Sequence, residues 1–297
     1  MNISHCRSRF PKLPAAARLI FFIFLTGAFN VAGVAQTGPA VVAGTDVKIH
    51  DVVFKTIDTV VLKLRVYALP RNKRSRKSPA IVYYFGGGWN TKNPPQFHEH
   101  ALRLAEKGMV AILADYRVKN VNGTSPMESL LDAKSAMRYV RSHARELRID
   151  SDRIAASGGS AGGHLAAACY TNDRFNDAGD DQRVSAKPNA LVLFNPVIDN
   201  GPDGYGYDRV KQWFPDFSPM HMITKGFPQT IFFIGTKDYL IPVATAETFR
   251  DKIIAVGSGC ELHVYDGAGH GFFNQPNYRS LVLPKVDAFL QRIGYVR

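Results

Sequence analysis

The chain has 297 residues, of which 45% are hydrophobic, 21% charged and 11% aromatic. This composition is typical of a globular protein and excludes disordered, collagen-like and coiled-coil chains. The formal net charge is +12, and no segment repeats at the intervals of roughly 20–50 residues that mark solenoids and propellers.

The first predicted segment is a secretory signal peptide over residues 1–35. Four basic side chains precede an uncharged, apolar run over residues 19–35. Gly33 and Ala35 are small, as expected before a cleavage site. The run is short for a bilayer span of ~20 residues. We therefore expect a secreted or periplasmic protein without stable membrane association after cleavage, and a single domain over residues 36–297.

The next segments predict strands and helices in alternation. Residues 47–55 and 59–67 are rich in β-branched side chains and predict an antiparallel hairpin. Five basic side chains follow within residues 71–77, which we interpret as a solvated loop, and no nucleic-acid partner is expected. Apolar runs then predict six strands, at residues 80–85, 110–115, 153–157, 190–195, 230–235 and 261–265. Between and after them we expect helices at residues 97–107, 130–144, 161–170, 243–256 and 280–293.

The six apolar strands lack a polar face, which predicts a parallel sheet covered by helices on both sides. Together with the hairpin they make an eight-stranded, mostly parallel sheet of the α/β class. In such sheets, functional residues lie at the carboxyl ends of the strands. Motifs that directly follow a predicted strand are therefore the candidates for chemistry.

One candidate is a serine on a glycine-rich turn, Gly158-Gly159-Ser160-Ala161-Gly162, between a predicted strand and a predicted helix. A sharp turn needs small residues two positions before and after the serine, and the helix dipole favours developing negative charge. A phosphate-binding turn and a plain tight turn are the alternatives, but no Walker sequence follows. We interpret Ser160 as a nucleophile.

A second glycine run, Gly86-Gly87-Gly88, follows the strand at residues 80–85 directly. Three glycines let backbone N–H groups approach a ligand closely. We predict that the amides of Gly87, Gly88 and Ala161 form an oxyanion hole. The alternative is a flexible loop without a binding role.

A nucleophilic serine needs a base, and the base needs an orienting carboxylate. Among the nine histidines, His270 lies in a glycine-rich loop directly after a predicted strand, and Asp238 lies just beyond another. The predicted triad is therefore Ser160, Asp238 and His270. Asp266 is the rival acid. His164, four residues after the serine, is interpreted as a packing histidine.

Taken together, these motifs resemble the α/β-hydrolase superfamily, and within it the microbial acetyl-esterase and hormone-sensitive-lipase-like branch. The matching segments read FGGGW, ADYR, ASGGSAGGH, GTKD and GHGFF, at residues 85–89, 114–117, 156–164, 235–238 and 269–273. Phe85 departs from the branch, which usually has a histidine there that supports the oxyanion loop. The resemblance implies hydrolysis of carboxylic esters with short, acetyl-like acyl groups through an acyl-enzyme on Ser160. We expect no cofactor, and no cysteine or histidine spacing suggests a metal site.

Residues 196–229 link two predicted strands and are too few for a large cap, so we expect a small cap or none. Five aromatic residues lie in this connection among glycines and charges: Tyr205, Tyr207, Trp213, Phe214 and Phe217. They suit a hydroxylated leaving group, or else they pack onto the sheet. The substrate is thus expected to be a small-molecule or carbohydrate ester. An amide-cleaving hydrolase (a peptidase or a formamidase) and a non-catalytic binding protein of this fold are the alternatives, and the oligomeric state is not predicted.

Overall fold

The computed structural model describes residues 40–41, 44–75, 77–171 and 174–297. The residues described from 44 onward belong to one compact unit. The predicted signal peptide, residues 1–35, lies outside the described residues and stays a prediction. Within the described part of the chain, no helix has both the length and the apolar character needed to cross a membrane.

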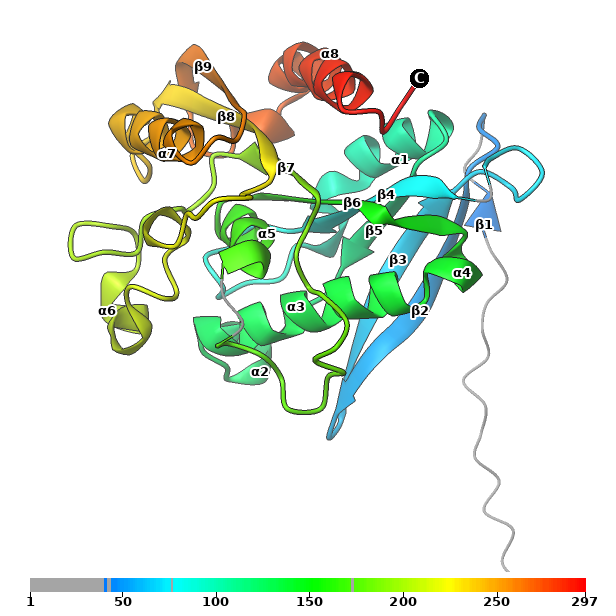
Figure 1. Ribbon diagram of the computed structural model, residues 1–297, viewed down its shortest axis with the longest axis horizontal. Helices are drawn as coiled ribbons and strands as arrows, with labels where there is room; N and C mark the ends of the chain where they lie inside the picture. Colours follow the sequence, from blue (N-terminus) through cyan, green and yellow to red (C-terminus); the bar gives the residue numbers. More distant parts are fainter. Residues whose placement is uncertain (1–39, 42–43, 76, 172–173) are drawn as a thin grey trace, which may run out of the picture. The chain divides into compact units, whose positions relative to one another are not determined.

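A twisted sheet forms the centre of the fold (Figure 1), and among the described residues it has nine strands in the order β1-β2-β3-β5-β4-β6-β7-β8-β9. β4 to β9 run parallel, and the β2–β3 hairpin joins β5 in antiparallel register. The eight predicted strands are present, and β1 adds a ninth that is too short to leave a pattern in the sequence. The bounds are β1 Ala40–Val41, β2 Lys48–Ile57, β3 Val60–Ala68, β4 Ser78–Tyr84, β5 Val110–Ala114, β6 Ile149–Gly159, β7 Ala190–Phe194, β8 Gln229–Lys237 and β9 Cys260–Gly269.

Helices cover both faces of the sheet, as predicted. α3, α5 and α7 pack on one face, and α1 and α8 on the other (Figure 1). β4 shows why the strands lack a polar face: Val82 and Tyr84 point into the first layer, Ile81 and Tyr83 into the second, and all are buried. The helix bounds are α1 His98–Glu106, α2 Lys119–Asn122, α3 Pro126–Ser142, α4 Ala144–Leu147, α5 Ala161–Thr171, α6 Tyr207–Val210, α7 Val243–Ala255 and α8 Pro276–Arg292.

Some boundaries differ from the predicted ones for local reasons. α3 begins at Pro126 rather than near residue 130, because Ser125 accepts from the N–H of Met127 while Glu128 accepts from the N–H of Ser125. β8 and β9 run beyond their predicted ends through glycines and polar residues that carry no strand pattern, and Lys237 pairs with Gly269. Consequently the residues after these strands stand close together at one edge of the sheet.

The connection between β7 and β8 is small, as expected. Within it the structure describes only the four-residue α6 and two short 3₁₀ turns, Lys211–Trp213 and Pro219–His221. No separate cap domain covers the carboxyl ends of β6, β7 and β8 in the described part of the chain. These ends therefore border directly on the pocket that contains Ser160.

Candidate active site

Ser160 sits on a strained turn between the end of β6 and the start of α5. Its φ angle is 53°, in the left-handed region that side chains rarely adopt. The flanking glycines are needed because the backbone crosses itself closely: a Cβ atom on Gly158 would lie 2.3 Å from the carbonyl carbon of Gly162, and one on Gly162 would lie 2.1 Å from the oxygen of Tyr84. The turn thus holds the hydroxyl of Ser160 above the sheet.

The structure brings the three residues of the predicted triad together. His270 Nε2 lies 2.9 Å from Ser160 Oγ. His270 Nδ1 lies 2.8 Å and 3.0 Å from the two carboxylate oxygens of Asp238. Because a carboxylate only accepts, Nδ1 carries the proton and Nε2 is left free to accept from the serine hydroxyl. The Asp238 side chain is 0% exposed, so water does not compete for it.

Asp238 is fixed from its other side by backbone amides. The N–H groups of Leu240 and Ile241 donate to its Oδ1 at 2.9 Å and 3.0 Å. The rival carboxylate of Asp266 is exposed and accepts instead from the hydroxyl of Thr236 at 3.0 Å. That contact links the ends of β8 and β9. Asp238 is therefore the carboxylate that pairs with the imidazole of His270.

Two of the three predicted oxyanion donors line the pocket that contains Ser160, and the third, Ala161, directly follows Ser160 in the chain. Gly87 and Gly88 line it with Ser160. The N–H of Ala161 opens α5 and so has no carbonyl partner within the helix. Gly87 has a φ angle of 137°, and a Cβ atom there would lie 2.4 Å from the oxygen of Thr91. The loop therefore depends on glycine to present its amides.

The loop is supported without the histidine that Phe85 replaces. The Phe85 ring stacks on Tyr116, with ring centroids 4.1 Å apart, and the Tyr116 hydroxyl donates to the Phe85 carbonyl at 2.6 Å. Gln96 accepts from the N–H of Gly86 at 2.6 Å. No sequence pattern indicated Gln96, because it lies in a short turn without a motif.

Arg209 holds the other end of the same loop, from the connection between β7 and β8. Its Nη1 donates to the carbonyl of Gly88 at 2.8 Å. Its guanidinium also lies over the rings of Trp89 and Tyr205, at 5.1 Å and 5.3 Å from their centroids. The small connection thus shapes the predicted oxyanion loop, a contact that sequence reasoning missed.

Asn195 is a third support that the sequence did not indicate. It directly follows β7, is buried, and has a φ angle of 35°. Its Oδ1 accepts from the N–H of Gly271 at 3.2 Å, while its Nδ2 lies 3.5 Å from both ring nitrogens of His270. Asparagine tolerates this left-handed backbone better than most residues, and its side chain steadies the loop that carries the imidazole.

The pocket at this site is small, with a volume of about 310 Å³, and its wall combines polar and apolar side chains. Apart from the glycines and the triad residues, its wall includes Thr91, Asn93, Gln96, Tyr205, Leu240, Phe273 and Asn274. Of the five aromatic residues noted in the connection, Tyr205 lines the pocket. Phe217 is buried against His164, and Trp213 packs on the core, so for these two the packing interpretation holds.

Two further buried polar side chains, His164 and Asp132, have structural roles. His164 is buried, and one ring nitrogen lies 2.9 Å from the carbonyl of Phe217. Burial lowers the pKa of His164 to about 4, so the ring is neutral. Asp132 is buried and paired with Arg117 at 2.7 Å and Lys55 at 2.9 Å. In the part of the chain that is described, no three histidine, cysteine or acidic side chains are grouped as metal ligands would be.

Comparison with known proteins identifies the family. The BD-FAE family matches residues 64–202, and the Dienelactone hydrolase family matches residues 203–291. Esterase LipC of Mycobacterium tuberculosis is 28% identical over 219 residues, covering 67% of this chain and 54% of that protein. An acetylxylan esterase of Xylanibacter ruminicola is 25% identical over 221 residues, covering 69% and 42%. The chain spans about half the length of these curated relatives.

A solved structure matches over nearly all of its own length. The structure of Thermogutta terrifontis esterase 2 phosphoramylated by tabun superimposes with a TM-score of 0.79 at 39% sequence identity, covering 84% of this chain and 96% of that chain. At that identity and coverage the likeness extends beyond the fold. The chain belongs to the esterases of the α/β-hydrolase superfamily.

Proposed function

We propose that this chain hydrolyses carboxylic esters of short acyl groups through an acyl-enzyme on Ser160. The observation that carries the proposal is the unbroken set of hydrogen bonds from Ser160 through His270 to Asp238, beside a pocket lined by glycine amides. A serine, a neutral imidazole and a buried carboxylate in this order are the groups that acyl transfer needs.

The reaction follows from the proton positions. His270 Nε2 takes the proton of Ser160 as its oxygen attacks the ester carbonyl, and Asp238 stabilises the imidazolium that forms. The amides of Gly87, Gly88 and Ala161 bind the oxyanion of the tetrahedral intermediate. His270 then returns the proton to the leaving alcohol. A water molecule, deprotonated by the same imidazole, releases the acid from the serine.

The size of the pocket supports a short acyl group. Its volume of about 310 Å³ lies near the lower end of the range of roughly 300–1,000 Å³ for ligand pockets. Two structures of Thermogutta terrifontis esterase 2 are described as propionate bound and butyrate bound. We therefore place acetate, propionate and butyrate esters among the preferred substrates.

The alcohol part is proposed to carry hydroxyl groups, as in a carbohydrate. Three amide side chains, Asn93, Gln96 and Asn274, line the pocket and offer donors and acceptors. Tyr239 lies near the catalytic candidate His270, with ring centroids 6.2 Å apart, and 82% of its surface is exposed. An exposed ring near His270, together with amides in the pocket wall, suits a sugar better than a fatty chain. The acetylxylan esterase among the relatives points the same way.

A series of aryl esters tests the acyl preference. We expect kcat/KM to be highest on acetate to butyrate esters and to fall at least about tenfold on octanoate. Ser160→Ala is expected to abolish turnover and labelling by a fluorophosphonate, whereas Ser280→Ala, an exposed serine on α8, retains both. Full activity in Ser160→Ala, or best turnover on octanoate, would contradict the proposal.

Two further substrates separate the alternatives. An acetylated xylo-oligosaccharide should release acetate faster than an acetylated alkyl alcohol does, at equal concentration. An aryl amide of the same acyl group should be cleaved far more slowly than the ester. A faster amide reaction would favour the peptidase or formamidase interpretation.

We also propose export from the cytoplasm, on the pattern of residues 1–35 alone. Expression of the full chain with its native start, followed by N-terminal sequencing of the exported protein, tests this. The expected new terminus is Gln36. Retention of the full-length chain in the cytoplasm would refute export.

A further inference from the structure

The described cations of the basic run, Arg71, Lys73, Arg74 and Lys77, belong to a much larger positive surface. Three hollows of about 850, 620 and 520 Å³ meet there, and all three include Asn72 in their walls. We call the combined wall of these three hollows the basic face. It surrounds the amino ends of β4 and β6, which pair at Ser78 and Ile149. Ser160 follows the opposite end of β6, roughly 30 Å away at the usual rise of a strand.

The charge of the chain is concentrated on this face. Ten lysine and arginine side chains line the three hollows, against the acids Glu146, Asp150 and Asp152. The side chains that line the basic face therefore carry a net charge of +7, and residues 36–297 as a whole carry a net charge of +8. Nearly all of the net positive charge that remains after the predicted cleavage therefore lies at one end of the sheet.

Ion pairs neutralise only part of this charge. Lys73, Lys107 and Arg153 pair with Asp46, Asp287 and Asp150. The other seven cations have no carboxylate within ion-pair distance in the parts of the chain that are described. Five of these seven lie close to one another on the loop after β3 and on and just after α4: Arg71, Arg74, Lys77, Arg145 and Arg148.

The loop is held in place, although three of its cations, Arg71, Arg74 and Lys77, have no carboxylate partner among the described residues. Arg74 donates to the carbonyls of Leu69, Leu147 and Arg148 at 3.2, 2.9 and 2.9 Å, and Arg148 donates to that of Arg71 at 2.9 Å. Burial, with added repulsion from Arg148 and Arg71, lowers the pKa of Arg74 to about 10. Cations fixed so close together repel one another, and a bound anion would relieve that repulsion.

We propose that the basic face binds an acidic polysaccharide, a flexible chain with carboxylate or sulfate groups at intervals. The face is concave, so a thin polymer can follow its hollows whereas a flat lipid surface cannot. It lacks the exposed aromatic rings on which bases stack, since its one aromatic residue other than His50, Tyr295, is buried. Asn72, Ser75 and Ser151 add polar groups for sugar hydroxyls.

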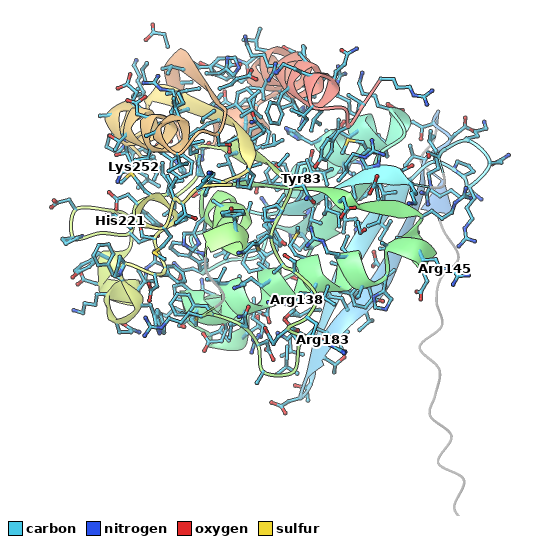
Figure 2. All side chains as sticks on the ribbon, viewed as in Figure 1. Tyr83, Arg138, Arg145, Arg183, His221 and Lys252 are labelled. Atoms are coloured by element: carbon cyan, nitrogen blue, oxygen red, sulfur yellow. The ribbon has the colours of Figure 1, made fainter. Side chains whose placement is uncertain are left out.

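This binding goes beyond the proposed hydrolysis and does not depend on it. A polymer held at the amino ends of the strands leaves the pocket at their carboxyl ends open. The enzyme could thus remain attached to an anionic matrix while Ser160 acts on esters nearby. Figure 2 shows Arg145 on one side of the molecule and Lys252, on α7, on the other, which supplies a control for non-specific charge effects.

Affinity electrophoresis of the full chain in gels containing polygalacturonate tests the proposal, with neutral dextran as the reference polymer. The variant Arg71→Gln/Lys77→Gln/Arg145→Gln removes three unpaired cations and spares Arg74, which holds the loop. The control variant Lys63→Gln/Lys252→Gln/Lys285→Gln removes three exposed lysines elsewhere. Turnover of an aryl acetate and thermal unfolding report on the catalytic site and the fold of each variant.

We expect polygalacturonate, but not dextran, to retard the chain, and high salt to abolish the effect. The variant of the basic face should bind at least about tenfold more weakly than the control variant, with aryl acetate turnover unchanged in both. If polygalacturonate bound equally weakly to both variants, net charge alone would explain the binding and the proposal would be overturned. Tighter binding to duplex DNA, or to vesicles of phosphatidylglycerol, than to polygalacturonate at matched charge and salt would overturn it as well.

Discussion

His100 should make the protein sensitive to acid, because its imidazole is buried as a neutral ring. The side chain is 1% exposed, and neither ring nitrogen has a hydrogen-bond partner among the described residues. The rings of Phe97 and Phe194 lie with centroids 5.3 Å away. Burial, and secondarily the charge of Arg279, lowers the pKa of His100 from 6.5 to about 3.

The sign and size of the effect follow from linkage. Between pH values of about 3 and 6.5, the unfolded chain binds a proton at residue 100 that the native protein excludes, so stability falls as the pH falls. Each pH unit in that window costs about 1.4 kcal/mol. Relative to neutral pH, His100 alone therefore removes about 2 kcal/mol at a pH of about 5. His164, with a pKa of about 4, removes a similar amount at that pH.

Urea unfolding of wild type and two variants at pH values of about 8 and about 5 measures this. His100→Leu removes both the titration and the unpaired polar ring, whereas His100→Asn removes the titration but keeps a buried polar group. Both variants should lose about 2 kcal/mol less than wild type between the two pH values, and the leucine variant should be the more stable of the two at the higher pH. All other titrating groups are shared and cancel in the comparison. An unchanged loss in both variants would refute a neutral, buried His100.

The other predictions concern the active site. Asp238→Asn should lower kcat by about four orders of magnitude, because the histidine then favours the wrong tautomer, while Asp266→Asn should stay within about twofold of wild type; the reverse pattern would reassign the acid. Asn195→Ala should lower kcat about tenfold with little change in KM, since the imidazole loses its support; an effect on KM alone would assign Asn195 to substrate binding. Arg209→Met should also lower kcat about tenfold by freeing the carbonyl of Gly88, and unchanged kinetics would mean that the loop holds its shape without Arg209.

Much of the candidate site was predictable because the side chains that it brings together lie at strand ends in local motifs. Ser160 could be identified from the predicted strand, turn and helix around it. The structure explains the small residues on either side, because the backbone crosses itself closely at this turn. The sheet was predictable for a related reason: residues buried on both faces leave an apolar run, as β4 does.

The supporting contacts were not predictable, because they depend on where each side chain lies in the folded protein rather than on its residue type. Gln96, Asn195 and Arg209 each bond to the backbone of a glycine loop, at sequence separations of 10, 76 and 121 residues. Any acceptor or donor of suitable length in that place could do so, and a lone polar residue in a turn has no periodic signal. The polar ends of β8 and β9 escaped prediction for the same reason, since main-chain pairing and the contacts of Thr236 with Asp266 and Gly267 hold them without an apolar pattern.

Phe85 provides the sharpest test of how this oxyanion loop is built. A histidine at that position would be expected to restore support if the loop were otherwise loose. Here Gln96 already accepts from Gly86, and residue 85 is 2% exposed with its ring stacked on Tyr116. Phe85→His would bury an imidazole at that stacked position at a cost of about 1–3 kcal/mol, with no amide left for it to hold. We therefore expect a lower urea midpoint and no gain in kcat on an aryl acetate; a gain in kcat at undiminished stability would mean that Gln96 does not replace the histidine.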